Sequence, residues 1–140
     1  MPADTVVEQA VRARMIASAP KMELVPATLR YERKDPFAVQ MAFPASATLA
    51  GAAVAWTFSR ELLEAGIAAP AGLGDVRIRP YGDDRTVLEF HAREGIAMVH
   101  LRTSELRRFL GRTETLVPGG CERQHLDLDQ DVSQLLGDAY

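Results

Sequence analysis

The chain has 140 residues, of which 47% are hydrophobic and 25% charged, and its formal net charge is −3 at pH 7. This length and balance predict a single folded domain over residues 1–140 and exclude a disordered chain. The net negative charge disfavours a general nucleic-acid binder, which needs a basic surface. Because the sequence shows neither the roughly 20 consecutive apolar residues of a membrane span nor an export signal, we expect a cytoplasmic protein.

The first half of the chain predicts strands separated by irregular segments. In residues 7–15 the apolar positions fit both the alternation of a strand and the period of a helix, so both interpretations stay open. Three prolines and a run of charges in residues 18–36 predict a loop with a short extended piece at 29–31. Residues 37–43 and 52–58 alternate apolar and polar side chains, which predicts a pair of antiparallel strands.

A helix of about two turns is predicted directly after these strands. The hydroxyl of Ser59 can accept a hydrogen bond from a free amide of the first turn, and Gly66 can take the left-handed conformation that ends a helix. Leu62, Leu63 and Ile67 share one side of this helix. Because so short a helix is not stable alone in water, we expect that side to pack on a sheet.

The second half repeats the order of strands followed by a helix. Thr103 is expected to cap the longer helix of this half. The order of elements predicts an α+β fold in which two antiparallel sheets pack with helices in a roughly duplicated β-β-β-α arrangement, followed by a C-terminal helix. The predicted elements are strands at 75–80, 86–92 and 96–101 and amphipathic helices at 103–114 and 125–136.

Several groups of polar residues invite a catalytic or metal-binding interpretation that their context does not support. The glycines of "GLGDV" follow a helix and open a strand, the reverse of a nucleotide-binding loop. In "HLDLDQD" the acids are explained by capping at a helix start, and His91 and His100 are interpreted as sheet-surface residues. Cys121 is interpreted as an inert thiol, because a nucleophilic Cys needs a His or a cationic neighbour that lowers its pKa. We therefore predict no catalytic residue, cofactor or metal.

One cluster of arginines is the candidate partner-binding surface. Two of its members fall in the predicted strand at 75–80 and three in the predicted helix at 103–114. The alternative is an ordinary solvated face, because Glu105 and Glu114 lie near in sequence and neutralise part of the charge. The five candidates are Arg77, Arg79, Arg107, Arg108 and Arg112.

Four stretches together carry a resemblance to a known family. They are similar, in this order along the chain, to segments of the SsgA-like proteins of sporulating actinobacteria, and closest to the SsgB type. The match covers most of the chain after about Leu29. The stretches are "DPFAVQMAF" at 35–43, "WTFSRELLEAGIAAPAGLGDVRIRP" at 56–80, "FLGRTETLVPGG" at 109–120 and "HLDLDQDVSQLL" at 125–136.

The resemblance implies a Whirly-like fold, a bell-shaped homotrimer and a non-enzymatic role in sporulation-specific cell division. In this family an SsgA-type paralogue places the SsgB type, which recruits the tubulin-like ring protein FtsZ, so these two are the expected partners at the septum. No catalytic residue is carried over. The alternative function is single-stranded nucleic-acid binding, which the Whirly likeness and the arginine cluster suggest and the net charge opposes.

Overall fold

The computed structural model describes residues 5–16, 23–45, 53–93 and 95–125. Four strands precede the first helix and three precede the second, whereas the predicted arrangement has three strands before each helix. The first half therefore has one strand more than predicted. The elements are β1 (Val6–Ile16), β2 (Glu23–Glu32), β3 (Ala38–Phe43), β4 (Val54–Ser59), α1 (Arg60–Ala68), β5 (Val76–Tyr81), β6 (Arg85–Ala92), β7 (Gly95–Arg102), α2 (Thr103–Leu116) and a 3₁₀ turn (Glu122–His125).

The seven strands form one antiparallel sheet in the order β4-β3-β2-β1-β7-β6-β5. The prediction of two separate sheets is therefore wrong, although the α+β class is confirmed. The join is β1, an 11-residue strand that pairs with β2 over most of its length. Its last three residues, Arg14–Ile16, also pair with β7. The pattern of residues 7–15 left this strand ambiguous, and the connection between the two groups of strands was missed with it.

Strand β2 occupies most of the segment that the prolines predicted to be a loop. It is ten residues long and alternates buried and exposed side chains as strictly as any other strand. Pro26 is tolerated inside it because β3 pairs only with Thr28–Arg30, so at Pro26 no hydrogen bond to β3 is lost. The side chains of β2 that face the core are Val25, Ala27, Leu29 and Tyr31.

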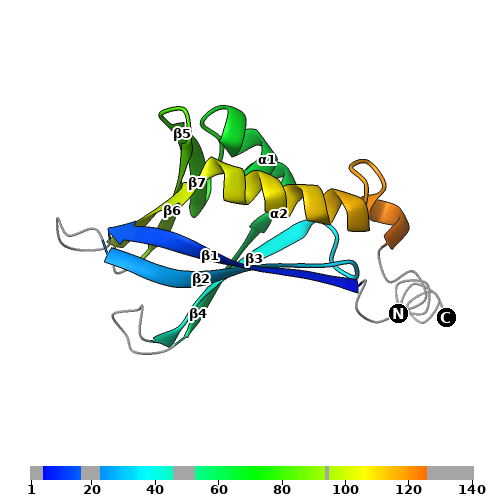
Figure 1. Cartoon of the computed structure of the whole chain (residues 1–140), viewed down its shortest axis with the longest axis horizontal. Helices are drawn as coiled ribbons and strands as arrows, with labels where there is room; N and C mark the ends of the chain where they lie inside the picture. Colours follow the sequence, from blue (N-terminus) through cyan, green and yellow to red (C-terminus); the bar gives the residue numbers. More distant parts are fainter. Residues whose placement is uncertain (1–4, 17–22, 46–52, 94, 126–140) are drawn as a thin grey trace.

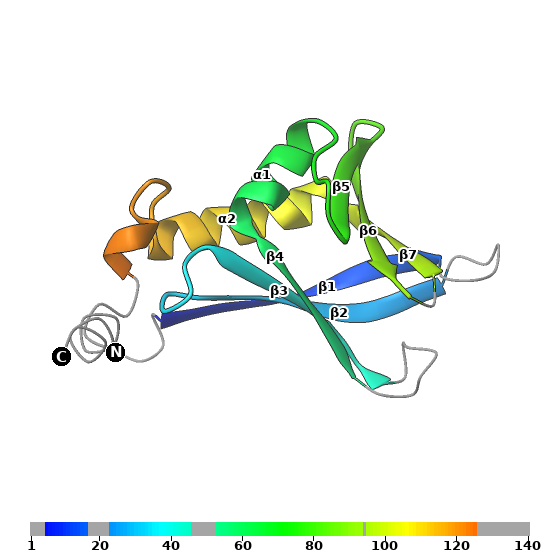
Figure 2. The same ribbon diagram turned by 180° about the vertical axis from the view of Figure 1, so that it is seen from behind.

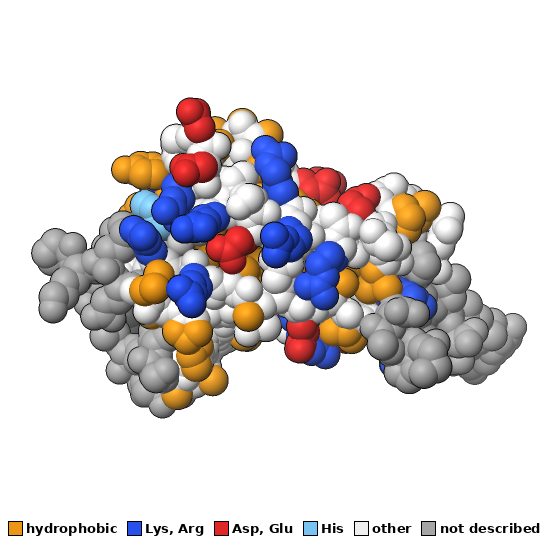
Figure 3. Space-filling view, in the orientation of Figure 1, with side chains coloured by type: hydrophobic (Ala, Val, Ile, Leu, Met, Phe, Trp, Pro, Cys, Tyr) orange, Lys and Arg blue, Asp and Glu red, His pale blue; other side chains and the backbone are white. Residues whose placement is uncertain are grey.

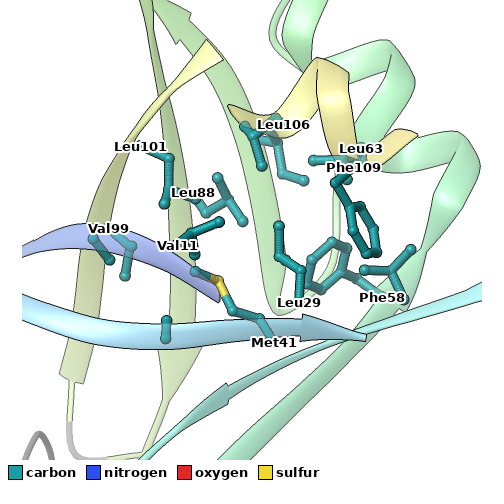
Figure 4. Close-up of a cluster of buried hydrophobic side chains, with 14 of the residues drawn as sticks. Val11, Leu29, Met41, Phe58, Leu63, Leu88, Val99, Leu101, Leu106 and Phe109 are labelled. Atoms are coloured by element: carbon teal, nitrogen blue, oxygen red, sulfur yellow. The ribbon is translucent and has the colours of Figure 1, made fainter. Parts of the chain in front are cut away.

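Both helices lie on one side of the curled sheet, and the core lies between them and the strands (Figures 1 and 2). Helix α1 packs against β5, and α2 crosses β1 and β7. Figure 4 shows Leu63 of α1 and Phe109 of α2 pointing toward Leu29 and Phe58 of the sheet. All of these side chains are buried, which supports the prediction that the short helix is stabilised by packing.

Helix α1 begins at the predicted cap, Ser59, but its close packing at Gly66 was not predicted. The backbone N–H of Leu62 donates to Oγ of Ser59 at 2.9 Å, so Ser59 is the N-cap. Gly66 does not end the helix in the left-handed conformation but lies inside it. A Cβ atom at Gly66 would lie 2.4 Å from Cβ of Ile78, so a glycine is needed because α1 and β5 approach so closely.

Helix α2 does not use Thr103 as its cap. Thr103 is the first helical residue, and its buried Oγ1 shares a hydrogen bond of 2.9 Å with Oγ1 of Thr86. Arg102 is the N-cap residue and makes no capping hydrogen bond through its side chain. The predicted C-terminal helix at 125–136 lies outside the described residues, apart from the 3₁₀ turn that reaches His125.

Arg60 ties the start of α1 to the end of α2 from a buried position, with 1% of its surface exposed. Nη1 donates to the carbonyl oxygen of Val117 at 2.8 Å, and Nη2 donates to Oε2 of Glu122 at 2.7 Å. This hydrogen bond from Arg60 lowers the pKa of Glu122. The guanidinium also lies 5.0 Å from the ring centroid of Tyr31, whose pKa burial raises to about 12.

Candidate partner-binding surface

A groove lined by four arginines lies beside the start of α2. It has a volume of about 770 Å³. One wall is formed by β1 and β2 and carries Arg12 and Arg14, while Arg85 of β6 and Arg102 of β7 line it from the other group of strands. Glu105 of α2 is the acidic residue of its lining. Figure 3 shows basic side chains gathered over α2 and the strand ends beside its start.

The alternation of β1 explains why its arginines point into the groove. Val11 and Ala13 are buried in the core, so Arg12 and Arg14 lie on the opposite face of the strand and are exposed. The pairing of β1 with β7 covers only the three residues from Arg14. Because the two strands are not paired before that point, a space opens between the two groups of strands beside α2.

The four groove arginines are not paired with acids in the described part of the chain, although Glu105 shares the lining. Arg30, on the neighbouring β2, in contrast pairs with both Glu8 and Glu32. The groove is therefore a local positive surface on a chain of net negative charge.

The positive charges of this surface also act on His100, a buried residue of β7. It lies directly opposite Arg14 in the β1–β7 register and is 8% exposed. Its pKa is lowered, first by burial and then by the positive charges of Arg79, Arg85 and Arg14. His91 pairs with Ile96 rather than facing His100, and its Nε2 lies 3.0 Å from Oε1 of Glu89.

None of the five arginines predicted from the sequence lines this groove. Arg77 and Arg79 lie on β5, where Nε of Arg77 donates to the carbonyl oxygen of Gly74 at 3.2 Å and Arg79 pairs with Glu89. The charge of Arg79 is close enough to act on His100 at the edge of the groove. Both residues line a different hollow, formed by β5 and the turn that precedes it.

Two of the three arginines of α2 share one side of the helix, and the third lies on another. Arg108 follows Glu105 by three residues and Arg112 follows Arg108 by four, which places them on one side of the helix. On that side Nη1 of Arg112 donates to the backbone oxygen of Glu8 in β1 at 3.0 Å. Arg107 is exposed on a different side of the helix, about a quarter turn from Arg108. The α2 side of the groove is therefore extended by Arg108 and Arg112.

The groove arginines themselves were missed by the sequence analysis. Arg12 and Arg14 stand in "VRARM", whose alternation is the signal that could have found them had residues 7–15 been interpreted as a strand. Arg85 and Arg102 are 17 positions apart and meet only through the β6–β7 register, in which they are direct partners. No short motif connects them.

The described residues give no support to a metal or catalytic site. The part of the chain with assigned structure contains no group of three or more His, Cys, Asp or Glu placed to hold a metal ion. Cys121 is a free, half-buried thiol. The segment after His125, which holds the acids considered above, lies outside that part. Among the described helices, none combines the length and the apolar character that crossing a membrane requires.

The chain belongs to the SsgA family. The family model described as "Streptomyces sporulation and cell division protein, SsgA" matches residues 25–122. Among curated relatives, the chain is 41% identical over 135 residues to the sporulation-specific cell division protein SsgB of Salinispora tropica, covering 94% of each chain. It is 37% identical over 139 residues to SsgB of Streptomyces coelicolor, covering 97% of this chain and 99% of the relative.

Solved structures agree with this assignment. An SsgA-like sporulation-specific cell division protein from Thermobifida fusca superimposes with a TM-score of 0.80 at 32% identity, covering 93% of this chain and 95% of that one. A structure from work on SsgB mutations and longitudinal cell division in Streptomyces coelicolor gives a TM-score of 0.77 at 34% identity, covering 87% and 96%. The resemblance seen in the sequence is confirmed, and it supports a role in cell division.

Proposed function

We propose that this chain is a non-enzymatic, sporulation-specific cell-division protein that helps to position the septum by binding FtsZ through protein contacts. The observation that carries the proposal is membership of the SsgA family, whose relatives are named sporulation-specific cell division proteins. The structure adds an exposed arginine-lined groove. An SsgA-type paralogue is the second proposed partner, and the septum is the proposed location.

The proposed partner-binding surface consists of the groove and the five arginines predicted from the sequence. Arg79 of β5 acts on His100 through its charge, and Arg108 and Arg112 extend the groove along α2, while Arg77 and Arg107 lie further out on the same two elements. Basic side chains on one face favour a partner of opposite charge and speed its encounter. The proposal places docking on this face.

A homotrimer of Whirly-like subunits is part of the same proposal. The Whirly-like fold is proposed from the family resemblance, and the structure contributes the α+β class, with both helices on one side of a single curled sheet. Several copies of one weak site held in a ring would bind a polymer such as an FtsZ filament with avidity that no single site needs to supply.

Co-sedimentation with polymerised FtsZ tests the proposal. The chain should be enriched in the pellet with FtsZ polymers relative to a control protein of similar size, and light scattering of the free chain should give the mass of a trimer. A chain that stays in the supernatant contradicts FtsZ binding. A monomeric mass contradicts the multivalent mode of binding.

A further inference from the structure

We infer that the groove between β1–β2 and β6–β7 binds an extended acidic peptide segment of a protein partner, with carboxylates at alternate residues along one face and an apolar side chain next to them on that same face. This inference rests on the proposed function, since it names the chemistry of the segment through which a partner would be docked. It is carried by the arrangement of Arg12, Arg14, Arg85 and Arg102 along the groove.

The spacing of the arginines on β1 matches an extended ligand. Arg12 and Arg14 are two residues apart on one strand and lie on the same face, so their Cα atoms are separated by roughly 7 Å. An extended peptide presents its own alternate side chains at the same interval. Two carboxylates at positions i and i+2 of such a peptide can therefore each meet one guanidinium.

The other two groove arginines, Arg85 and Arg102, lie where their positive charges are unfavourable, and a bound anion would reduce that cost. Arg85 and Arg102 are direct partners in the β6–β7 register, where two positive side chains repel each other. Arg102 is also the N-cap residue of α2, where a positive charge opposes the helix dipole. Folding alone does not account for these charges, because no acid of the described residues pairs with them.

Apolar side chains stand beside the charges on the β2 wall. Leu24 lies opposite Arg14 and Pro26 lies opposite Arg12 in the β1–β2 register, and both belong to the lining of the groove. Leu24 is 60% exposed. A ligand that carries only charge would leave this wall in water, whereas a peptide with an apolar residue two positions from an acid, and so on the same face, covers it.

The composition of the groove favours a peptide over a single-stranded nucleic acid. Proteins that bind single strands usually combine basic residues with aromatic side chains on which bases stack. None of the residues that line the groove is aromatic, and its apolar members are aliphatic. Glu105 in the lining further opposes a continuous phosphate backbone.

The test is fluorescence anisotropy of a labelled twelve-residue peptide in which Glu alternates with Thr and one central Glu is replaced by Leu, so that the Leu lies on the Glu face. The matched control peptide carries Gln in place of Glu. We expect binding of the Glu peptide that weakens as salt is raised, and binding of the Gln peptide weaker by about tenfold or more. Equal binding of the two peptides would overturn the inference.

Two double variants with the same change in net charge locate the site. Arg12→Gln with Arg14→Gln should weaken binding of the Glu peptide by about tenfold or more. Lys34→Gln with Arg93→Gln should change it by less than about twofold, because these exposed residues lie in turns at the far ends of β2 and β6. Equal losses in the two double variants would show a net-charge effect and overturn the inference.

His100 gives a second readout that does not depend on substitution. Carboxylates bound at Arg14 and Arg85 would offset the positive charges that lower the pKa of His100, so saturation with the Glu peptide should raise that pKa in an NMR titration. An unchanged His100 pKa at saturation would place the peptide elsewhere and overturn the inference. Tighter binding of a twelve-nucleotide oligothymidylate than of the Glu peptide would also overturn it.

The outcomes separate this inference from the proposed function. If the wild-type chain co-sediments with FtsZ but does not bind the Glu peptide, the inference fails and the proposed function stands. If it binds the peptide with the expected dependence on Arg12 and Arg14 but does not co-sediment, the proposed function fails and the inference stands.

Discussion

Arg60 and the arginines of the groove are the same residue type in opposite situations. Arg60 is buried, and its guanidinium donates to backbone oxygens and to Glu122. Arg12 and Arg14 are exposed and form no ion pair with the described acids. Removing a buried charge that is hydrogen-bonded leaves its partners unsatisfied, whereas removing an exposed one costs little. The comparison therefore separates arginines that hold the fold from arginines available to a partner.

The largest expected effect is that of Arg60→Ala. It leaves the carboxylate of Glu122 and the carbonyl of Val117 without their donor, so the free energy of unfolding should fall by about 3–5 kcal/mol. Urea denaturation measures it. The matched control is Arg123→Ala in the neighbouring 3₁₀ turn, which is exposed and should change stability by less than about 0.5 kcal/mol. A loss of similar size in both variants would contradict the contrast between buried and exposed arginines.

The packing beside Arg60 gives the next effect in size. Gly66→Ala places a Cβ 2.4 Å from Cβ of Ile78, so α1 must shift from β5 and stability should fall by about 1–3 kcal/mol. Gly111→Ala is the control in α2, because its Cβ would meet open space and should stabilise by about 0.5–1 kcal/mol. Thermal unfolding should therefore move in opposite directions for the two variants, and a shared direction would refute the packing argument.

The pairing of Arg60 with Glu122 predicts a pH dependence. Because the folded-state pKa of Glu122 lies below its ordinary value of 4.5, ionised Glu122 stabilises the fold above that value. This contribution is lost as the pH falls from about 4.5 through the lowered pKa. The difference in unfolding free energy between wild type and Glu122→Gln should shrink over this window. A difference that stays constant from pH 6 to pH 3 would contradict the pairing.

The smallest effect on stability is expected in the groove. Arg12→Gln with Arg14→Gln removes two charges that repel their neighbours and pair with no described acid, so the free energy of unfolding should change by less than about 0.5 kcal/mol. Urea denaturation of this double variant, run in parallel with Arg60→Ala, measures the change in the free energy of unfolding. A loss above about 1 kcal/mol would mean that the groove arginines hold the fold after all.

Much of the fold could be predicted where the local pattern was decisive. The alternation of β3 and β4, the cap at Ser59 and the buried face of α2 follow from spacing and side-chain chemistry. Pro26 misled the prediction for β2, because whether a proline breaks a strand depends on which neighbouring strand pairs beside it. Strand pairing belongs to the tertiary structure, so the local sequence around Pro26 does not show it.

The candidate site was predicted less well than the fold. The five arginines chosen from the sequence stand in elements that were easy to recognise, and none of them lines the groove. Arg60 was overlooked because "FSRELL" gives no sign that its third residue is buried. The Arg85–Arg102 pair depends on strand register, which distant residues decide. Burial and register are the two properties that this sequence does not show locally.

The central claim is that the exposed arginines of the groove dock a cell-division partner and do not hold the fold. Co-sedimentation with polymerised FtsZ, run in parallel on three proteins, tests it most directly. Wild type and Lys34→Gln with Arg93→Gln should be enriched in the pellet, and Arg12→Gln with Arg14→Gln should stay largely in the supernatant while folded. Equal recovery of all three proteins in the pellet, or of none, would contradict the claim.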